Sequence, residues 1–143
     1  MPSRLVMRWL GETHKFWYRA TGGRIGGRFG KVRMLLLTTT GRRSGRPWTT
    51  PLSYLKDADD LVLIASNGGS DRHPAWYLNL RANPKVTVEV PGKKLSATAE
   101  TASPEEKARL WPHIIDMYPG YDSYQRRTTR DIPVVILRPE ERA

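Results

Sequence analysis

The segment MLLLTTTGRRSGRPWTTPL, residues 34–52, predicts a β-hairpin whose turn is unusually basic. Its flanks are rich in the β-branched and aromatic residues that favour strands. Two glycines bracket the turn, which carries Arg42, Arg43 and Arg46. Like charges crowded into one turn repel one another, so the pattern indicates an anionic ligand, with a solvated hairpin tip as the alternative.

The rest of the chain predicts more strands and two helices around this hairpin. The strands are expected over residues 33–40, 47–56, 60–66, 85–90, 94–101 and 132–139. The sequence HPAWYLNLRANP predicts a short helix with Pro74 in its first turn and an end at Asn83-Pro84. Ser103 to Glu106 read as a capping box, which predicts a helix over 104–117. About six strands with inserted helices indicate an α+β domain built on a small, mainly antiparallel barrel.

Residues 1–30 differ from the barrel-forming part, residues 31–143. Residues 4–20 predict a basic amphipathic helix bearing tryptophans. Such a helix could lie on a membrane surface, although packing against the domain is favoured. The glycine-rich segment 22–31 predicts a flexible connector and lacks the Gly-Lys-Ser/Thr ending of a phosphate loop.

Composition restricts the compartment and the partners. The chain has 143 residues and no cysteine, which excludes disulfides and thiolate sites and fits a reducing, cytoplasmic compartment. The net charge is +10, and the excess is confined to residues 1–50, which hold 11 Lys and Arg against one acid. This charge would attract nucleic acid, an anionic membrane face or a phosphorylated small molecule, or it is solubilising surface charge.

A second candidate site is the sequence ASNGGSDRHPAWYLNL, residues 65–80. A strand is expected to end at Ser66, where two glycines let the backbone approach a ligand closely beside a helix N-terminus. Trp76 and Tyr77 open that helix. They either stack on a planar ligand or belong to the core.

A third candidate is MYPGYDSYQRR, which spaces Tyr118, Tyr121 and Tyr124 three residues apart. Helical spacing would put the three rings on one face, but Pro119-Gly120 favours an irregular, partly exposed segment. Phenol hydroxyls lining a cavity can orient a carbonyl group and donate a proton. The three histidines are far apart, so no metal site is expected. The residues alone therefore indicate a small basic barrel that binds a planar, anionic molecule.

Three motifs in this order resemble the deazaflavin-dependent nitroreductase family. They are MLLLTTTGRRSGRPWTTPL, ASNGGSDRHPAWYLNLRANPKV and MYPGYDSYQ followed by IPVVILRP, and the resemblance covers about residues 30 to 139. The family consists of split-barrel reductases, quinone reductases among them, that use the 8-hydroxy-5-deazaflavin coenzyme F-420. The resemblance implies a split β-barrel enzyme that transfers a hydride from the reduced coenzyme to a quinone or nitroaromatic electrophile.

The resemblance also implies a role for each motif. The coenzyme's phosphate and oligoglutamate tail would be held by Arg42, Arg43, Ser44, Gly45 and Arg46. The deazaflavin ring would be approached by Ser66, Asn67, Gly68 and Gly69, with Ala75, Trp76 and Tyr77 beside it. The substrate pocket would contain Tyr118, Tyr121 and Tyr124, and either a tyrosine or Ser66 would meet the developing oxyanion.

Two positions depart from the best-studied branch of the family. Asn67 replaces a lysine there, which weakens the expected grip on the tail, and Ser53 replaces a tyrosine, which reshapes the expected substrate pocket. Three alternatives stay open: an FMN-dependent split-barrel reductase, a deazaflavin carrier without turnover, and a nucleic-acid-binding barrel. The last is disfavoured, because the aromatic residues are not interleaved with the basic turn.

Overall fold

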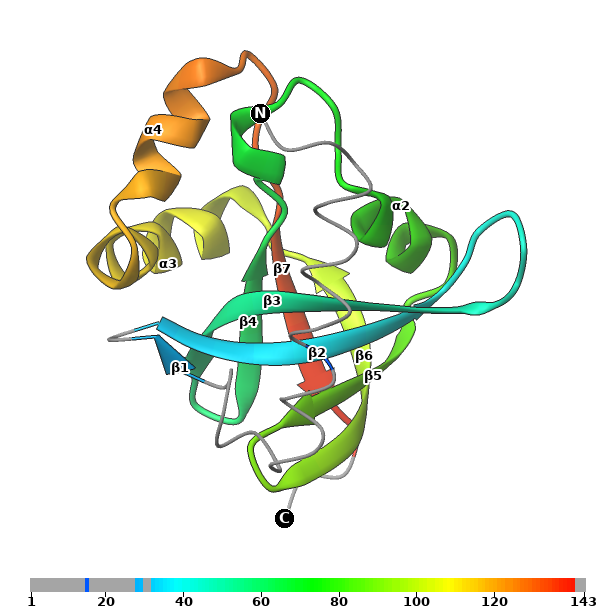
Figure 1. The fold of residues 1–143 in the computed structure, drawn as a ribbon. Helices are drawn as coiled ribbons and strands as arrows, with labels where there is room; N and C mark the ends of the chain where they lie inside the picture. The colour runs from blue at the N-terminus through cyan, green and yellow to red at the C-terminus, as the bar shows by residue number, and fades with distance from the viewer. Residues whose placement is uncertain (1–14, 16–27, 30–31, 141–143) are drawn as a thin grey trace.

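The computed structural model describes Lys15, Arg28–Phe29 and residues 32–140 (Figure 1). The strands in this part are β1 (Arg28–Phe29), β2 (Val32–Thr40), β3 (Pro47–Asp57), β4 (Asp60–Ile64), β5 (Lys85–Val90), β6 (Lys93–Thr101) and β7 (Val134–Pro139). The helices are a 3₁₀ turn η1 (Asn67–Gly69), α2 (Ala75–Ala82), α3 (Pro104–Met117) and α4 (Gly120–Arg127). None of the helices described there is long and apolar enough to span a membrane.

Six of the strands close into an antiparallel barrel in the order β2-β3-β4-β7-β6-β5. The barrel closes because β2 pairs with β5 as well as with β3, and Leu37 lies opposite Val88 in that seam. The expected α+β barrel is confirmed, and the six strands match the six expected segments to within two residues at each end. The expected strand 60–66 ends at Ile64, so Ala65 and Ser66 begin the loop that follows.

The barrel interior is filled by apolar side chains that alternate along each strand. Leu35 and Leu37 of β2, Leu63 of β4 and Val88 of β5 are completely buried there. Alternation follows from the strand geometry, since successive side chains point to opposite faces. One end of the interior is closed by side chains of α2, namely Trp76, Tyr77 and Leu80.

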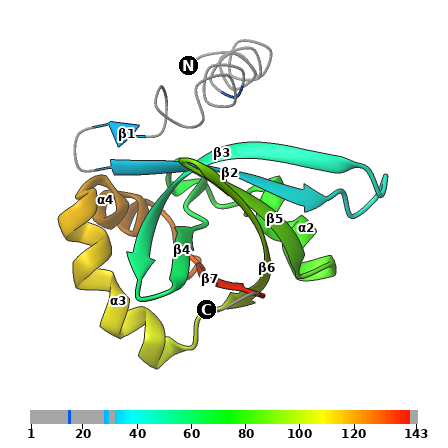
Figure 2. The ribbon, with the colours of Figure 1, turned by 90° about the horizontal axis from the view of Figure 1, so that it is seen from below.

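A second core lies outside the barrel, where α3 and α4 cover the outer side of β4 and β7 (Figure 2). The helix α3 has the bounds expected from its capping box, and both reciprocal hydrogen bonds of that box join Ser103 and Glu106. Its buried residues Leu110 and Ile114 are one turn apart and face the sheet. The helices thereby hold the tyrosine-rich segment against the barrel.

Three expectations need correction. Residues 118–127 are not irregular: Pro119 is the N-cap of α4, with φ −60°, a value that Pro favours and that a helix also uses. Pro74 is the N-cap of α2 and not part of its first turn. Arg28 and Phe29, inside the expected connector, pair with β2 as β1.

Of the expected helix over 4–20 only Lys15 is described, and its Nζ donates to the carbonyl oxygen of Thr49 at 3.2 Å.

Candidate functional site

The basic turn joins β2 to β3 at the tip of the long hairpin (Figure 1). The N–H of Gly45 donates to the carbonyl of Gly41 at 2.8 Å, and Gly45 adopts a left-handed φ of 71° that suits glycine. The Ser44 hydroxyl accepts from the backbone N–H of Arg46 at 3.2 Å. These bonds close the turn internally, and its three arginines are exposed.

Arg42 has a structural contact that its two neighbours lack. Its backbone N–H and its Nη1 both donate to Oδ1 of Asn79 on α2, at 3.1 and 3.2 Å. The Asn79 side chain is buried, and its Nδ2 donates to the hydroxyl of Thr39 at 3.2 Å. Arg43 and Arg46 make no ion pair with the described residues. An anion would therefore meet two uncommitted guanidinium groups and a third that also anchors the turn.

The loop after β4 carries the second candidate motif. Asn67, Gly68 and Gly69 adopt successive left-handed φ values of 47°, 64° and 84°. Such a run of positive φ turns the chain sharply. Ser66 is buried and Gly68 is exposed. A Cβ built on Gly68 would meet no atom within 4 Å, so the surface beside it is open.

Arg130 holds this loop in place. Its guanidinium donates to the carbonyl oxygens of Ser66 at 2.7 Å, Ser70 at 2.8 Å and Ala65 at 3.1 Å. Burial lowers the pKa of Arg130, and the nearby Asp71 carboxylate acts in the opposite direction. One side chain thus satisfies three backbone acceptors of a loop that has no regular ladder of its own.

The three tyrosines form a cluster, with Tyr118 at the C-terminal end of α3 and Tyr121 and Tyr124 on α4. Tyr118 and Tyr121 meet edge to face with ring centroids 5.2 Å apart, and Tyr121 and Tyr124 do so at 5.9 Å. Tyr118 is 40% exposed, whereas Tyr121 is 8% exposed. The cluster therefore extends from an exposed ring at Tyr118 to a buried ring at Tyr121.

Tyr121 joins the cluster to the barrel wall. Its hydroxyl forms a short hydrogen bond with the Ser53 hydroxyl of β3. Burial raises the pKa of the Tyr121 phenol above its ordinary value of 10.0, although the bond to Ser53 acts in the other direction. The pKa of Tyr124 is also raised, first by its hydrogen bond with Tyr118. Both phenols therefore keep their protons at neutral pH.

The structure brings two of the three motifs together. A Cβ on Gly69 would lie 3.1 Å from the backbone of Tyr124, so the loop of residues 66–69 packs directly on α4. The basic turn lies apart from them, bonded to α2. Trp76 and Tyr77 are 6% and 5% exposed and pack in the barrel core, and Ala75 at the start of α2 is exposed. Contact of these three α2 residues with the coenzyme stays a prediction.

Sequence reasoning missed two residues that build the site, Arg130 and Asn79. Each acts on backbone or side-chain atoms that are distant along the chain: 60 residues separate Arg130 from Ser70, and 37 separate Asn79 from Arg42. A lone arginine after a helix carries no local signal of such a partner. A short polar residue inside the apolar face of α2 was the one available hint for Asn79.

The adjacent glycines of the loop give a matched pair of substitutions. We expect Gly68→Ala to lower the free energy of unfolding by about 1 kcal/mol, the ordinary cost of a left-handed alanine. Gly69→Ala should cost at least about 2 kcal/mol, because its Cβ also meets the Tyr124 backbone. Urea unfolding of the two variants measures this difference, and equal costs would contradict the packing of the loop on α4.

The comparisons with known proteins identify the family. The family model described as "F420H(2)-dependent quinone reductase" matches residues 9–139. A Mycobacterium tuberculosis protein named F420H(2)-dependent quinone reductase is 44% identical over 144 residues, which cover 92% of this chain and 97% of that protein. The chain belongs to this family.

Solved structures agree with the quinone reductase family. One described as an F420-H2 dependent reductase, FDR-A, has a TM-score of 0.68 and 39% identity, and the match covers 73% of this chain and 92% of that one. Another, described as a domain-swapped dimer, has a TM-score of 0.71 and 34% identity, covering 88% and 93%. The expected family, barrel fold and enzyme class that uses coenzyme F-420 are thereby confirmed. The roles of individual residues stay predictions.

Proposed function

We propose that this quinone reductase transfers a hydride from reduced coenzyme F-420 to a quinone held against Tyr118, Tyr121 and Tyr124. The observation that carries the proposal is the packing of the loop of residues 66–69 on α4. Gly69 of this loop packs on the backbone of Tyr124, Gly68 beside it faces open space, and the same helix carries the buried phenol of Tyr121. A planar ring needs an open surface to lie on. A carbonyl oxygen that gains negative charge needs a hydrogen-bond donor such as a phenol.

The residues present fit the coenzyme at both of its ends. Arg43 and Arg46 are exposed and form no ion pair within the described residues, so they are available to the phosphate and the acidic tail. Gly68 offers backbone without a side chain where the ring would approach. Asn67 cannot supply the positive charge of a lysine, because its side chain is a neutral amide. Its Nδ2 donates to the carbonyl of Arg72 at 3.0 Å. The turn arginines are therefore the main cationic contacts in this proposal.

The chain's own part in the chemistry is orientation and proton supply. When bound, the reduced coenzyme supplies the hydride. The Tyr121 hydroxyl is a neutral donor, held in place by Ser53 and by the neighbouring rings. It would donate a hydrogen bond to the quinone oxygen that acquires negative charge. The remaining wall of tyrosine rings limits the access of water to that oxygen.

Fluorescence titration with oxidised coenzyme F-420, run beside FMN, tests the proposal. We expect Arg43→Ala/Arg46→Ala to weaken coenzyme binding by about tenfold or more, since two charge-assisted contacts are lost. Arg42 is left intact because its loss would also free Asn79. The control is Lys85→Ala/Lys94→Ala, which removes two exposed charges from β5 and β6 and should bind normally.

The alternatives predict different results in the same experiment. Tight FMN binding without a deazaflavin signal would overturn the proposed coenzyme contacts. Coenzyme binding without oxidation of its reduced form by any quinone would favour a carrier. Parallel assays with a nitroaromatic compound test the second class of electrophile, which the resemblance includes.

A further inference from the structure

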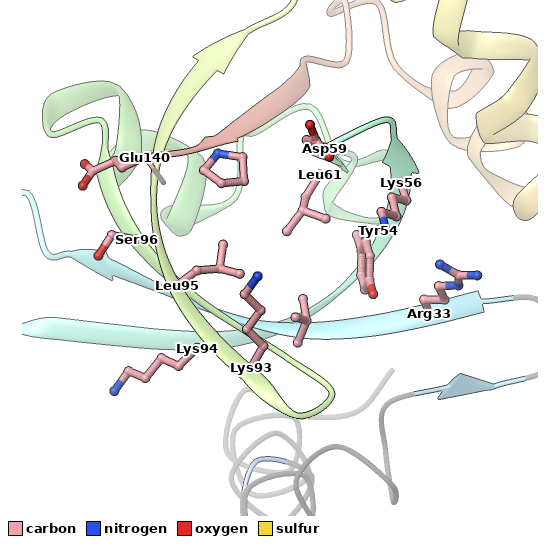
Figure 3. A pocket seen from close by; sticks show the side chains of 12 residues that line it. Arg33, Tyr54, Lys56, Asp59, Leu61, Lys93, Lys94, Leu95, Ser96 and Glu140 are labelled. Atoms are coloured by element: carbon pink, nitrogen blue, oxygen red, sulfur yellow. The ribbon is translucent and has the colours of Figure 1, made fainter. Parts of the chain in front are cut away.

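A cavity of about 570 Å³ opens at one end of the barrel interior (Figure 3). β4 runs from this cavity, which Leu61 lines, to the loop that contains Ser66. β3 runs the other way, from the basic turn to Tyr54 and Lys56 in the cavity wall. None of the residues assigned above to the coenzyme or the quinone lines it. Mouths of β-barrels are common positions for small-molecule sites, and the volume lies in their usual range of roughly 300–1,000 Å³.

On three strands, the series of side chains that faces the barrel interior ends in a cationic residue at the mouth of the cavity. Along β2, Leu35 and Leu37 are buried in the core, and Arg33 is the preceding residue on the same face. Lys56 follows the buried Tyr54 in the same way on β3. On β6, Leu95 packs on the core and Lys93 precedes it.

The alternation distinguishes Lys93 from its neighbour Lys94. Figure 3 shows the Lys93 side chain rising toward the cavity and that of Lys94 pointing away from it. Two acidic residues lie at the rim of the cavity. Asp59 is in the turn between β3 and β4, and the side chain of Glu140 points away from the cavity. The inward-facing charges on the three strands are therefore cations, and Asp59 lies at the rim.

These cations have no anionic partner in the described part of the chain. No ion pair there involves Arg33, Lys56 or Lys93. The floor between them is apolar and includes Leu61, which is 7% exposed. Burial raises the pKa of the Tyr54 phenol despite the nearby Arg33 guanidinium, so its hydroxyl stays a hydrogen-bond donor. The cavity thus combines an apolar surface with donors and positive charge.

We propose that this cavity binds an organic carboxylate with an apolar chain. The chain would lie on the leucines of β4 and β6, and the carboxylate would be held by Lys56, Lys93 and Arg33. A neutral molecule of the same shape would gain only the apolar contacts. A small inorganic anion would gain only the charge contacts, which water screens at this open mouth.

Calorimetric titration of the chain with dodecanoate, below its micelle concentration, tests the proposal, with dodecanol as the neutral probe. We expect dodecanoate to bind about tenfold or more tightly than dodecanol, because only the carboxylate can form charged hydrogen bonds with the cations at the mouth. Lys56→Gln/Lys93→Gln should weaken dodecanoate binding by about tenfold. Lys85→Gln/Lys94→Gln is the control: Lys94 lies at the rim with its side chain pointing away from the cavity, so this variant should change the affinity by less than about twofold. Equal losses in the two double variants, or equal binding of both probes, would overturn the proposal.

Two further measurements locate the bound probe. Saturating coenzyme F-420 should leave dodecanoate affinity unchanged, whereas displacement would put dodecanoate in the coenzyme site and overturn the proposal. Methyl NMR shifts on the unmodified chain should concentrate at Leu61, Val90 and Leu95, which keeps the test valid if a variant fails to fold. Shifts elsewhere would contradict it. The result does not depend on reductase activity, since the two sites share no assigned residue.

Discussion

Arg130→Met should lower the free energy of unfolding by about 2–4 kcal/mol and loosen the loop of residues 66–69. The substitution keeps much of the apolar stem but removes donors from three carbonyl oxygens, those of Ala65, Ser66 and Ser70. The first two residues are buried, so water replaces the lost partners poorly. Coenzyme affinity should fall together with stability, because the glycines of this loop would no longer be held at their left-handed φ values.

Urea unfolding followed by circular dichroism measures the effect, with Arg126→Met as the matched control. Arg126 pairs with Asp122 on the surface of α4 at 2.6 Å and is 79% exposed. Loss of such an exposed pair costs less than about 1 kcal/mol. Arg130→Lys should restore only part of the stability, since an ammonium group cannot reproduce the fork of a guanidinium. An Arg130→Met protein as stable as the Arg126→Met control would refute the anchoring role.

Tyr121→Phe should reduce quinone turnover by about 10- to 1000-fold, the usual cost of losing one donor to a developing oxyanion. Coenzyme affinity should stay near that of the unmodified chain, because the ring and its contacts with Tyr118 and Tyr124 are kept. The raised pKa of Tyr121 gives a pH signature. A phenol whose pKa exceeds 10.0 keeps its proton until the solution passes that value. The part of the rate that depends on Tyr121 should therefore stay constant through neutral pH. It should decline only when the pH exceeds the ordinary tyrosine pKa of 10.0.

Tyr54→Phe is the control for this substitution. Tyr54 follows Ser53 on β3 but faces the barrel interior, so its hydroxyl has no route to the tyrosine cluster. Steady-state assays at saturating coenzyme should show nearly full turnover for this variant. If Tyr121→Phe keeps full turnover, the proton donor lies elsewhere. If it loses coenzyme binding instead, Tyr121 belongs to the coenzyme site.

Local patterns accounted for most of the secondary structure. The capping box at Ser103 placed α3 correctly, because both of its hydrogen bonds form between residues three apart. The hairpin around Arg42 and Arg43 was equally local, since glycines permit its turn. Pro119-Gly120 led to the wrong expectation of an irregular segment, because the local pattern omits the tertiary packing of the residues that follow. Proline disfavours a helix interior but is accepted at its start, and packing of Tyr121 on the outer core stabilises the helix that follows.

The amino-acid sequence by itself determined the barrel strands, the family and the three motifs, because each depends on residue order within a short segment. Tertiary structure decided which motifs meet. It placed Gly69 against α4, joined Ser53 to Tyr121, and bonded Arg130 to a loop 60 residues earlier. It also turned Tyr54 and Ser53 to opposite faces of one strand, so that Tyr54 lines the cavity and Ser53 bonds Tyr121. These relations arise from closure of the barrel and docking of the helices, which bring together groups that no local pattern connects.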